Sequence, residues 1–180
     1  MLESERDLRD EQALDIARKM LVAARTAPKG KGVDILECAV VTAEHAEELA
    51  CEMEAIAEER GHKFFLRDAD NVRQAQAVVL IGTRPQLMGL DCGHCGYATC
   101  AEKPQAIPCA VNCIDVGIAI GSAVSRAADM RVDNRVLFSA GLAAERLGLL
   151  GEGVGQVYAI PISIGSKSPF FDRPSTRPQA

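Results

Sequence analysis

The sequence predicts an α+β fold in which helices pack on a small mixed sheet. Segments with helical periodicity alternate with short apolar runs, and the last apolar run comes long after the others. The chain has 180 residues, of which 48% are hydrophobic and 25% charged. This length and composition fit one domain over residues 1–180 and exclude a wholly disordered chain.

Two helices are predicted in the first third of the chain. Apolar residues recur at helical spacing over 11–25, and Pro28 comes directly after this helix. A second helix over 43–60 is expected to begin at Thr42, whose hydroxyl suits an N-cap. Gly61 is expected to end it, because glycine adopts the left-handed conformation readily.

The rest of the chain contains strands, further helices and a tail. Apolar and β-branched runs predict strands over residues 36–41, 63–67, 77–81 and 157–163. Helical patterns predict helices over 71–76, 113–128 and 132–149. The C-terminal segment, 169–180, is rich in proline and is expected to be extended.

Charge and composition exclude several classes of function. The chain carries 25 acidic and 20 basic residues, a net charge of −5, and its aromatic content is 4%. A nucleic-acid-binding protein needs a basic face or stacking aromatic side chains, so nucleic acid is not an expected partner. No segment approaches the ~20 continuous apolar residues of a membrane span, and the acidic N-terminus does not resemble a secretory signal. The sequence therefore predicts a cytoplasmic protein.

Five of the seven cysteines fall within residues 92–113, part of an irregular segment rich in glycine and proline. We interpret residues 89–113 as a loop inserted between a strand and a helix. Its cysteines follow the spacing C-x2-C-x4-C-x8-C, with one more just beyond: Cys92, Cys95, Cys100, Cys109 and Cys113. Disulfides are rare in the cytoplasm, so this cluster indicates metal binding or redox chemistry.

An iron–sulfur cluster explains the spacing best. Gly93 and Gly96 each follow a cysteine, and glycine lets a loop turn sharply around a cluster. Zinc is an alternative, but its four-cysteine sites more often have two C-x2-C pairs. A redox dithiol at Cys92 and Cys95 is another, but it would leave Cys100 without a role.

The fourth ligand is either Cys109 or Cys113, and we favour Cys109. Cys113 comes one helical turn later, where a thiol also packs well as a small apolar group. Cys38 and Cys51 lie in a predicted strand and a predicted helix, and we expect both to be packing residues. His94 lies inside the loop and is expected to be exposed.

The segment from Cys92 to Cys100 resembles the Cys-Gly-x-Cys-Gly-x-x-x-Cys run of small four-iron domains. Together with Ala24–Gly30, Asp115–Ala123 and Phe170–Arg173, it makes the chain similar to a family of uncharacterised ferredoxin-domain proteins. The resemblance extends over most of the chain. It implies a four-iron–four-sulfur (4Fe-4S) cluster whose ligands are Cys92, Cys95, Cys100 and Cys109.

A second resemblance is to the nitroreductase fold, a flavin-binding α+β dimer. Ala27–Gly30 is similar to its early Ala-Pro-Ser segment, with Lys29 in place of serine, and Gly141–Leu149 is similar to its late helix. This likeness implies FMN as a further cofactor and a homodimer. Three cations near the early segment are candidates for holding a phosphate or flavin, or else for a solvated turn: Arg25, Lys29 and Lys31.

Three functions follow from these observations. The first is a 4Fe-4S electron-transfer protein, with an unknown reaction and an unknown redox partner protein. The second is an FMN-dependent oxidoreductase that receives electrons from the cluster. The third is a binding module with a structural four-cysteine metal site, because the binding energy of such a metal stabilises the fold. Phe170 and Phe171 are expected to anchor the tail on a partner subunit, or alternatively on the chain's own core.

Overall fold

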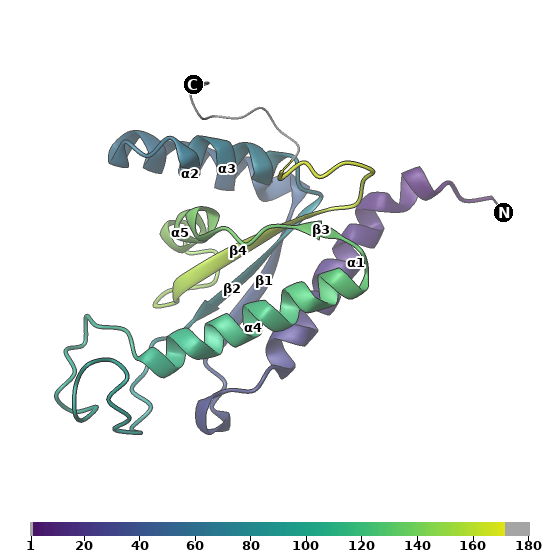
Figure 1. Cartoon of the computed structure of the whole chain (residues 1–180). Helices are drawn as coiled ribbons and strands as arrows, with labels where there is room; N and C mark the ends of the chain where they lie inside the picture. Colours follow the sequence, from purple (N-terminus) through teal and green to yellow (C-terminus); the bar gives the residue numbers. More distant parts are fainter. Residues whose placement is uncertain (1, 172–180) are drawn as a thin grey trace, which may run out of the picture.

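The computed structural model describes residues 2–171, apart from the side chains of Ala43 and Glu44, and has helices on both faces of a sheet (Figure 1). The helices are α1 (Glu5–Thr26), the short 3-10 turn η1 (Gly30–Gly32), α2 (Ala43–Arg60), α3 (Phe64–Arg73), α4 (Ala110–Asp129) and α5 (Phe138–Arg146). The strands are β1 (Leu36–Thr42), β2 (Ala77–Thr83), β3 (Asp133–Asn134) and β4 (Gly155–Ser163).

The strands are ordered β1-β2-β4-β3, and every described pair is antiparallel. The α+β class is therefore confirmed, but the sheet is antiparallel and not mixed. The connection from β1 to β2 explains the difference. Two helices in succession, α2 and α3, return the chain to the end of the sheet where β1 stopped, so Thr42 pairs with Ala77.

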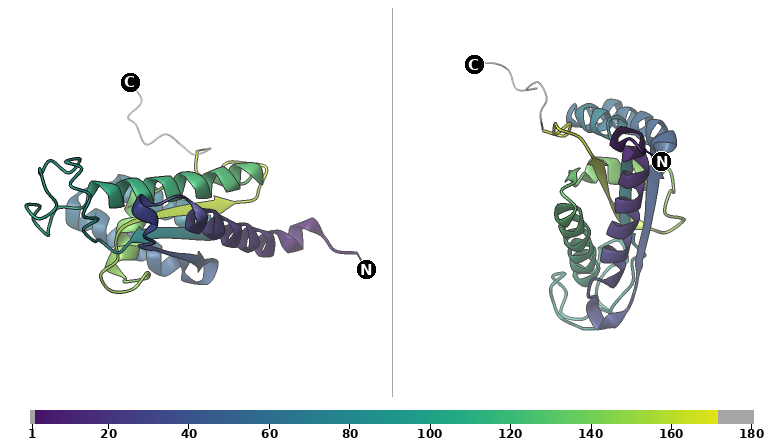
Figure 2. Two further views of the ribbon diagram at one scale, coloured as in Figure 1. Left: turned by 90° about the horizontal axis from the view of Figure 1, so that it is seen from below. Right: turned by 90° about the vertical axis from the view of Figure 1, so that its right-hand side faces the viewer.

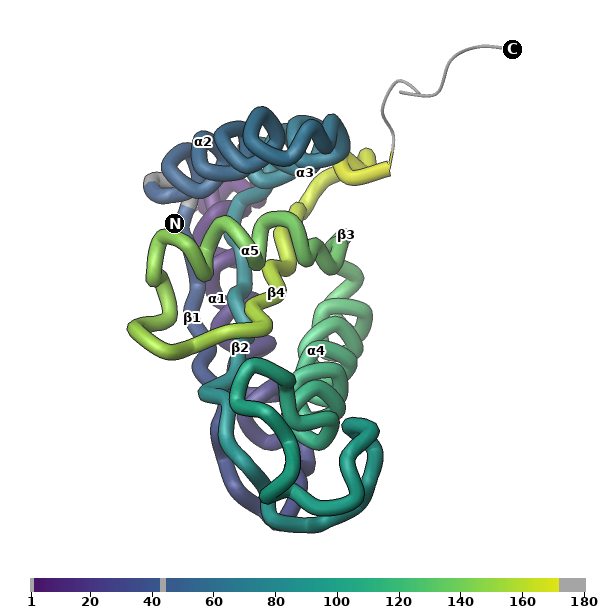
Figure 3. The backbone as a smooth tube through the Cα atoms, turned by 90° about the vertical axis from the view of Figure 1, so that its left-hand side faces the viewer, coloured from purple at the N-terminus to yellow at the C-terminus, as the bar shows by residue number. Residues whose placement is uncertain are grey.

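Strand β2 is buried along its whole length and separates two hydrophobic cores. Side chains alternate between the faces of a strand. Val78 and Leu80 pack with α2, α3 and α5, while Val79 and Ile81 pack with α1 and α4. Figure 3 shows these two sets of helices on opposite sides of the sheet.

Three predicted elements differ from the structure. The helix predicted over 71–76 is not separate, since its first residues are the end of α3, which stops at Arg73. Residues 63–67, predicted as a strand, begin helix α3, because Phe65, Ala69 and Val72 recur at helical spacing and form its buried face. The helix predicted over 132–149 is shorter and begins at Phe138. The residues before it pair with β4 instead, since backbone pairing across the sheet outweighs local helical pattern there.

The segment between β2 and α4 has no regular secondary structure and projects beyond one end of the sheet (Figures 2 and 3). Most of the predicted loop over 89–113 lies in this segment, although α4 begins at Ala110 and therefore includes its last residues. At the other end of the chain, Phe170 is fully buried in the core formed with α2, α3 and α5. Phe171 is 60% exposed, with the Arg135 guanidinium 5.0 Å from its ring centre. Residues 172–180 of the predicted extended tail lie outside the described residues.

Helix α4 is long and apolar enough to cross a membrane by length and composition alone, with 33% of its most apolar window buried. Core helices pass the same test. In this fold Val116, Ala119, Ala123 and Ala127 pack against α1 and the sheet, as in a core helix. The cytoplasmic location stays a prediction.

The contact between α5 and β4 leaves no room for a side chain at Gly141. A Cβ atom there would lie 1.8 Å from the carbonyl oxygen of Val157, whereas a Cβ at Gly121 in α4 would meet nothing within 4 Å. We expect Gly141→Ala to lower the free energy of unfolding by about 3 kcal/mol or more, because α5 must move off the sheet. Gly121→Ala should raise it by roughly 0.5–1 kcal/mol, through helix propensity. Urea denaturation of both variants measures the contrast, and equal stabilities would contradict this packing.

Candidate metal centre

The four predicted ligands line a single hollow at the end of the sheet. Cys92, Cys95, Cys100 and Cys109 all contribute to its lining, although they span 18 residues of sequence. Among residues 2–171, Lys103 is the one cationic side chain that lines it. A loop that brings four thiols to one small space has the donor set of an iron–sulfur or zinc site.

Glycines turn the loop around this hollow as the sequence predicts. Gly93 and Gly96 have φ angles of 71° and 89°, which side-chain-bearing residues rarely adopt. The Gly96 N–H donates to the Gly93 carbonyl at 2.9 Å and closes the tight turn between them. Asp91 supports the next part of the loop, since its carboxylate accepts the Cys100 N–H at 2.6 Å.

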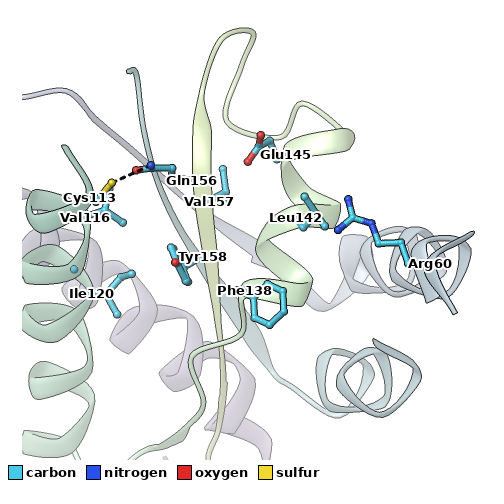
Figure 4. A pocket seen from close by; sticks show the side chains of 11 residues that line it. Arg60, Cys113, Val116, Ile120, Phe138, Leu142, Glu145, Gln156, Val157 and Tyr158 are labelled. Carbon is cyan, nitrogen blue, oxygen red and sulfur yellow. Dashed lines mark hydrogen bonds between the residues drawn. The ribbon is translucent and has the colours of Figure 1, made fainter. Parts of the chain in front are cut away.

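Cys109 and Cys113 point to different places despite being one turn apart. Cys109 is buried and is the N-cap of α4, so the hollow lies at the helix end where backbone N–H groups and the helix dipole favour anionic groups. The exposed Cys113 lines a second cavity, where its sulfur accepts an N–H from the Gln156 side chain at 3.1 Å (Figure 4). The geometry thus groups Cys109, and not Cys113, with the other three cysteines.

Within residues 2–171, no three His, Cys, Asp or Glu side chains are grouped so as to hold one metal ion. A zinc ion would need all four sulfurs about 2.3 Å from one point. In a cubane each thiolate binds a different iron atom, so the sulfurs stand around a larger body. The residues that line the hollow fit such a group by number and type, since they include four cysteines and the N-terminus of a helix.

The other cysteines and the loop histidine lie outside the hollow. His94 is exposed, as predicted. Cys38 packs against the core beneath α1, and burial raises the pKa of its thiol. The prediction that Cys51 is a packing residue is wrong: Cys51 is exposed on α2, where its thiol donates to the Glu47 carboxylate, and this hydrogen bond raises the pKa of the thiol. Cys51 lies on a polar face of α2, and the residue type alone does not show whether a cysteine is exposed or buried.

The three cations proposed for a phosphate each have a protein partner. Arg25 donates to the Asp34 carboxylate at 2.7 Å, a hydrogen bond that raises the pKa of the guanidinium, and to the Leu36 carbonyl. Lys29 donates to carbonyls at the end of α1, among them that of Ala27 at 2.7 Å. These contacts are all within the chain, and both the solvated turn and the binding of phosphate by these residues stay predictions.

Lys31 and its neighbour Gly30 connect this turn to the cysteine loop and to α4. The Lys31 ammonium donates to the Met88 carbonyl at 3.1 Å, just before the loop begins. The Gly30 N–H donates to both carboxylate oxygens of Asp115 in α4, at 2.9 and 3.1 Å. Asp115 is 2% exposed, and sequence reasoning assigned it no role. Its position inside an apolar helix was the one feature of the sequence that indicated a structural role, because a buried carboxylate needs hydrogen-bond donors.

Comparison with known proteins identifies the family. A family model described as "Uncharacterized protein containing a ferredoxin domain" matches residues 105–173. A protein of Archaeoglobus fulgidus, described only as uncharacterized, is 40% identical over 183 residues, which cover 96% of this chain and 98% of the relative. The chain belongs to this ferredoxin-domain family. The matched segment includes Cys109 and Cys113 and begins after the first three cysteines of the loop.

Solved structures show that the ferredoxin-domain chain has a nitroreductase-like fold. A nitroreductase with bound FMN from Desulfitobacterium hafniense has a TM-score of 0.61 and 15% identity, covering 99% of this chain and 85% of that one. A BluB-like flavoprotein from Clostridium difficile has a TM-score of 0.56 and 17% identity, covering 99% and 87%. At these identities the likeness establishes the fold alone, and both resemblances seen in the sequence are confirmed.

The Asp115 carboxylate is expected to hold the start of α4 against the Gly30 turn. Asp115→Ala leaves the Gly30 N–H without its acceptor and should lower the free energy of unfolding by about 1–3 kcal/mol. Asp115→Asn keeps one acceptor oxygen and should cost less. Asp129→Ala is the matched control, because its carboxylate is exposed and lies 3.7 Å from Arg126. Denaturant unfolding of the three variants tests the order, and an Asp115→Ala variant as stable as the control would contradict it.

Proposed function

We propose that the protein is an electron-transfer protein that binds one 4Fe-4S cluster through Cys92, Cys95, Cys100 and Cys109. The observation that carries the proposal is that these four cysteines line one hollow. Membership of the ferredoxin-domain family supports it. Such a cluster, when bound, exchanges one electron at a time with a partner.

The residues of the chain would set the electrostatics of this site. A cluster with four thiolate ligands is anionic, and the N-terminus of α4 presents N–H groups and a positive dipole end toward it. The Lys103 ammonium adds a positive charge at the wall of the hollow and is held there by the Pro104 carbonyl at 3.0 Å and by the Ile107 carbonyl. Both features stabilise additional negative charge and therefore favour the reduced state.

The two cysteines at the start of α4 provide the test. Chain purified or reconstituted without oxygen should contain about four iron atoms and show broad visible absorbance that bleaches reversibly on reduction. Cys109→Ser should lose most of the iron and the absorbance, because it removes a ligand. Cys113→Ser is the matched control on the same helix turn, and it should keep both.

Colourless chain carrying one zinc would overturn the proposal in favour of a structural metal site. Iron loss in Cys113→Ser with retention in Cys109→Ser would overturn the ligand set. Circular dichroism of both variants separates loss of the ligand from loss of the fold.

The second candidate is an FMN-dependent oxidoreductase that receives electrons from the cluster. The bound FMN in the structurally similar D. hafniense nitroreductase favours it, whereas the intramolecular contacts of Arg25, Lys29 and Lys31 do not. FMN should be released when purified chain is denatured, at about one per chain, if this function holds. Absence of flavin, even after incubation with FMN, would exclude it, and gel filtration of the same samples tests the homodimer.

A further inference from the structure

A second cavity lies between α4, α5 and the first half of β4 and extends to the end of α2 (Figure 4). Its volume of about 560 Å³ falls in the range of small-molecule sites. The side chains that line it come from segments far apart in the sequence: Arg60, Cys113, Val116, Ile120, Phe138, Leu142, Glu145, Gln156, Val157 and Tyr158. The four-cysteine hollow is separate, since none of its cysteines lines this cavity.

The walls of the cavity are apolar and include exposed aromatic surface. Val116 and Ile120 form the side of α4, while Phe138 and Leu142 form the side of α5. Phe138 is 53% exposed, although a phenylalanine of this fold can be fully covered, as Phe65 is. An exposed aromatic face inside a cavity is available to a ring-containing ligand, which gains free energy by covering it.

Arg60 places a cation without an ion pair at one end of the cavity. On α2, Glu52 and Glu59 pair with Arg146, and Glu47 and Glu54 pair with Arg73. No ion pair of Arg60 occurs among the residues that the structure describes. A guanidinium in this state recognises a carboxylate or phosphate group.

The other polar groups of the cavity suit hydrogen-bond donors of a ligand, in contrast to Arg60, which suits an anion. The carboxylate of Glu145 lines another part of the wall, nearer to Val157, where it can accept a hydrogen bond from a ligand (Figure 4). The Gln156 amide lies beside the Cys113 sulfur at the α4 end. Gln156 has a φ of 50°, a backbone conformation that residues other than glycine rarely adopt and that clusters at functional sites. A ligand that carries an N–H or O–H donor as well as an acidic group fits this set.

The cavity begins one helical turn from the predicted cluster. The Cys113 N–H donates to the Cys109 carbonyl at 3.2 Å within the first turn of α4. Cys109 faces the four-cysteine hollow and Cys113 faces the cavity. A molecule bound in the cavity would therefore lie on the far side of a single turn from a cluster ligand.

We propose that this cavity binds the small molecule that exchanges electrons with the cluster, and that this molecule is an organic acid with a redox-active ring. Its ring lies against Phe138 and Ile120, and its acidic group pairs with Arg60. In each transfer the reduced cluster would be oxidised by one electron and the ring reduced by one electron. The redox role rests on the proposed function, whereas the binding of ring acids does not.

The rate at which Cys113 reacts with a thiol reagent measures how readily that reagent enters the cavity. The probes are two aromatic disulfides, the dianionic 5,5′-dithiobis(2-nitrobenzoate) and the neutral 2,2′-dithiodipyridine. In each case the Cys113 sulfur attacks the disulfide, a mixed disulfide forms, and one aromatic thiolate leaves. Mass spectrometry of the Cys113 peptide gives the rate for each probe in iron-loaded chain, and chain unfolded in denaturant gives the intrinsic ratio of the two rates.

We expect the rate of Cys113 labelling by the anionic probe, divided by the rate with the neutral probe, to be about tenfold higher in folded chain than in unfolded chain. A net charge of −5 favours the opposite, so general electrostatics cannot produce this result. Arg60→Gln should abolish the preference, and Arg126→Gln, an exposed cation on α4 outside the cavity, should leave it unchanged. Naphthalene-2-carboxylate should slow the labelling of Cys113 by both probes, and naphthalene-2-carboxamide should do so less.

The proposal would be overturned if the ratio of the two labelling rates of Cys113 were the same in folded and unfolded chain. It would also be overturned if the preference for the anionic probe persisted in Arg60→Gln. The iron content of the same samples distinguishes its failure from that of the proposed function. A preference in chain that binds no iron supports the ring-acid site and removes its redox role. An intact cluster without a preference overturns the ring-acid site alone.

Discussion

The position of helix α4 against α1 and the sheet decides which hollow each of its cysteines lines. Ala119, Ala123 and Ala127 hold one side of the helix against α1 and the sheet. The hydrogen bonds from Gly30 to Asp115 fix its first turns. Cys109 is therefore directed to the four-cysteine hollow and Cys113 to the neighbouring cavity. Both proposed sites therefore depend on how α4 packs against α1 and the sheet.

The rest of the fold supports α4, and the loop before it carries the cysteines. Strand β2 is buried on both faces, and its two cores fix the sheet and the helices. The cysteine loop joins β2 to α4 at the edge of this base, tied to it through Lys31 and Met88. Binding groups carried on a loop between two packed elements are a common arrangement in proteins, because the scaffold supplies the geometry and the loop supplies the chemistry.

Much of the fold could be predicted from residue patterns, and the errors have physical causes. The helix ending at Gly61 and the buried strand after Gln76 follow from capping and hydrophobic runs, which act locally. The segment 63–67 was predicted as a strand because a short apolar run does not distinguish a strand from a buried helix. Residues 132–137 carry a helical pattern but pair with β4, which local sequence cannot report.

The sequence by itself determined the cysteine spacing, the glycine turns and the likeness to ferredoxin-domain proteins, because these depend on neighbours along the chain. It left Cys109 and Cys113 as alternatives and gave no indication of the cavity beside α4. Only the tertiary structure decided between the two environments and brought Arg60, Phe138 and Gln156 to one cavity. Side chains from four separate elements meet there through packing, and no periodicity within one segment encodes a contact between segments.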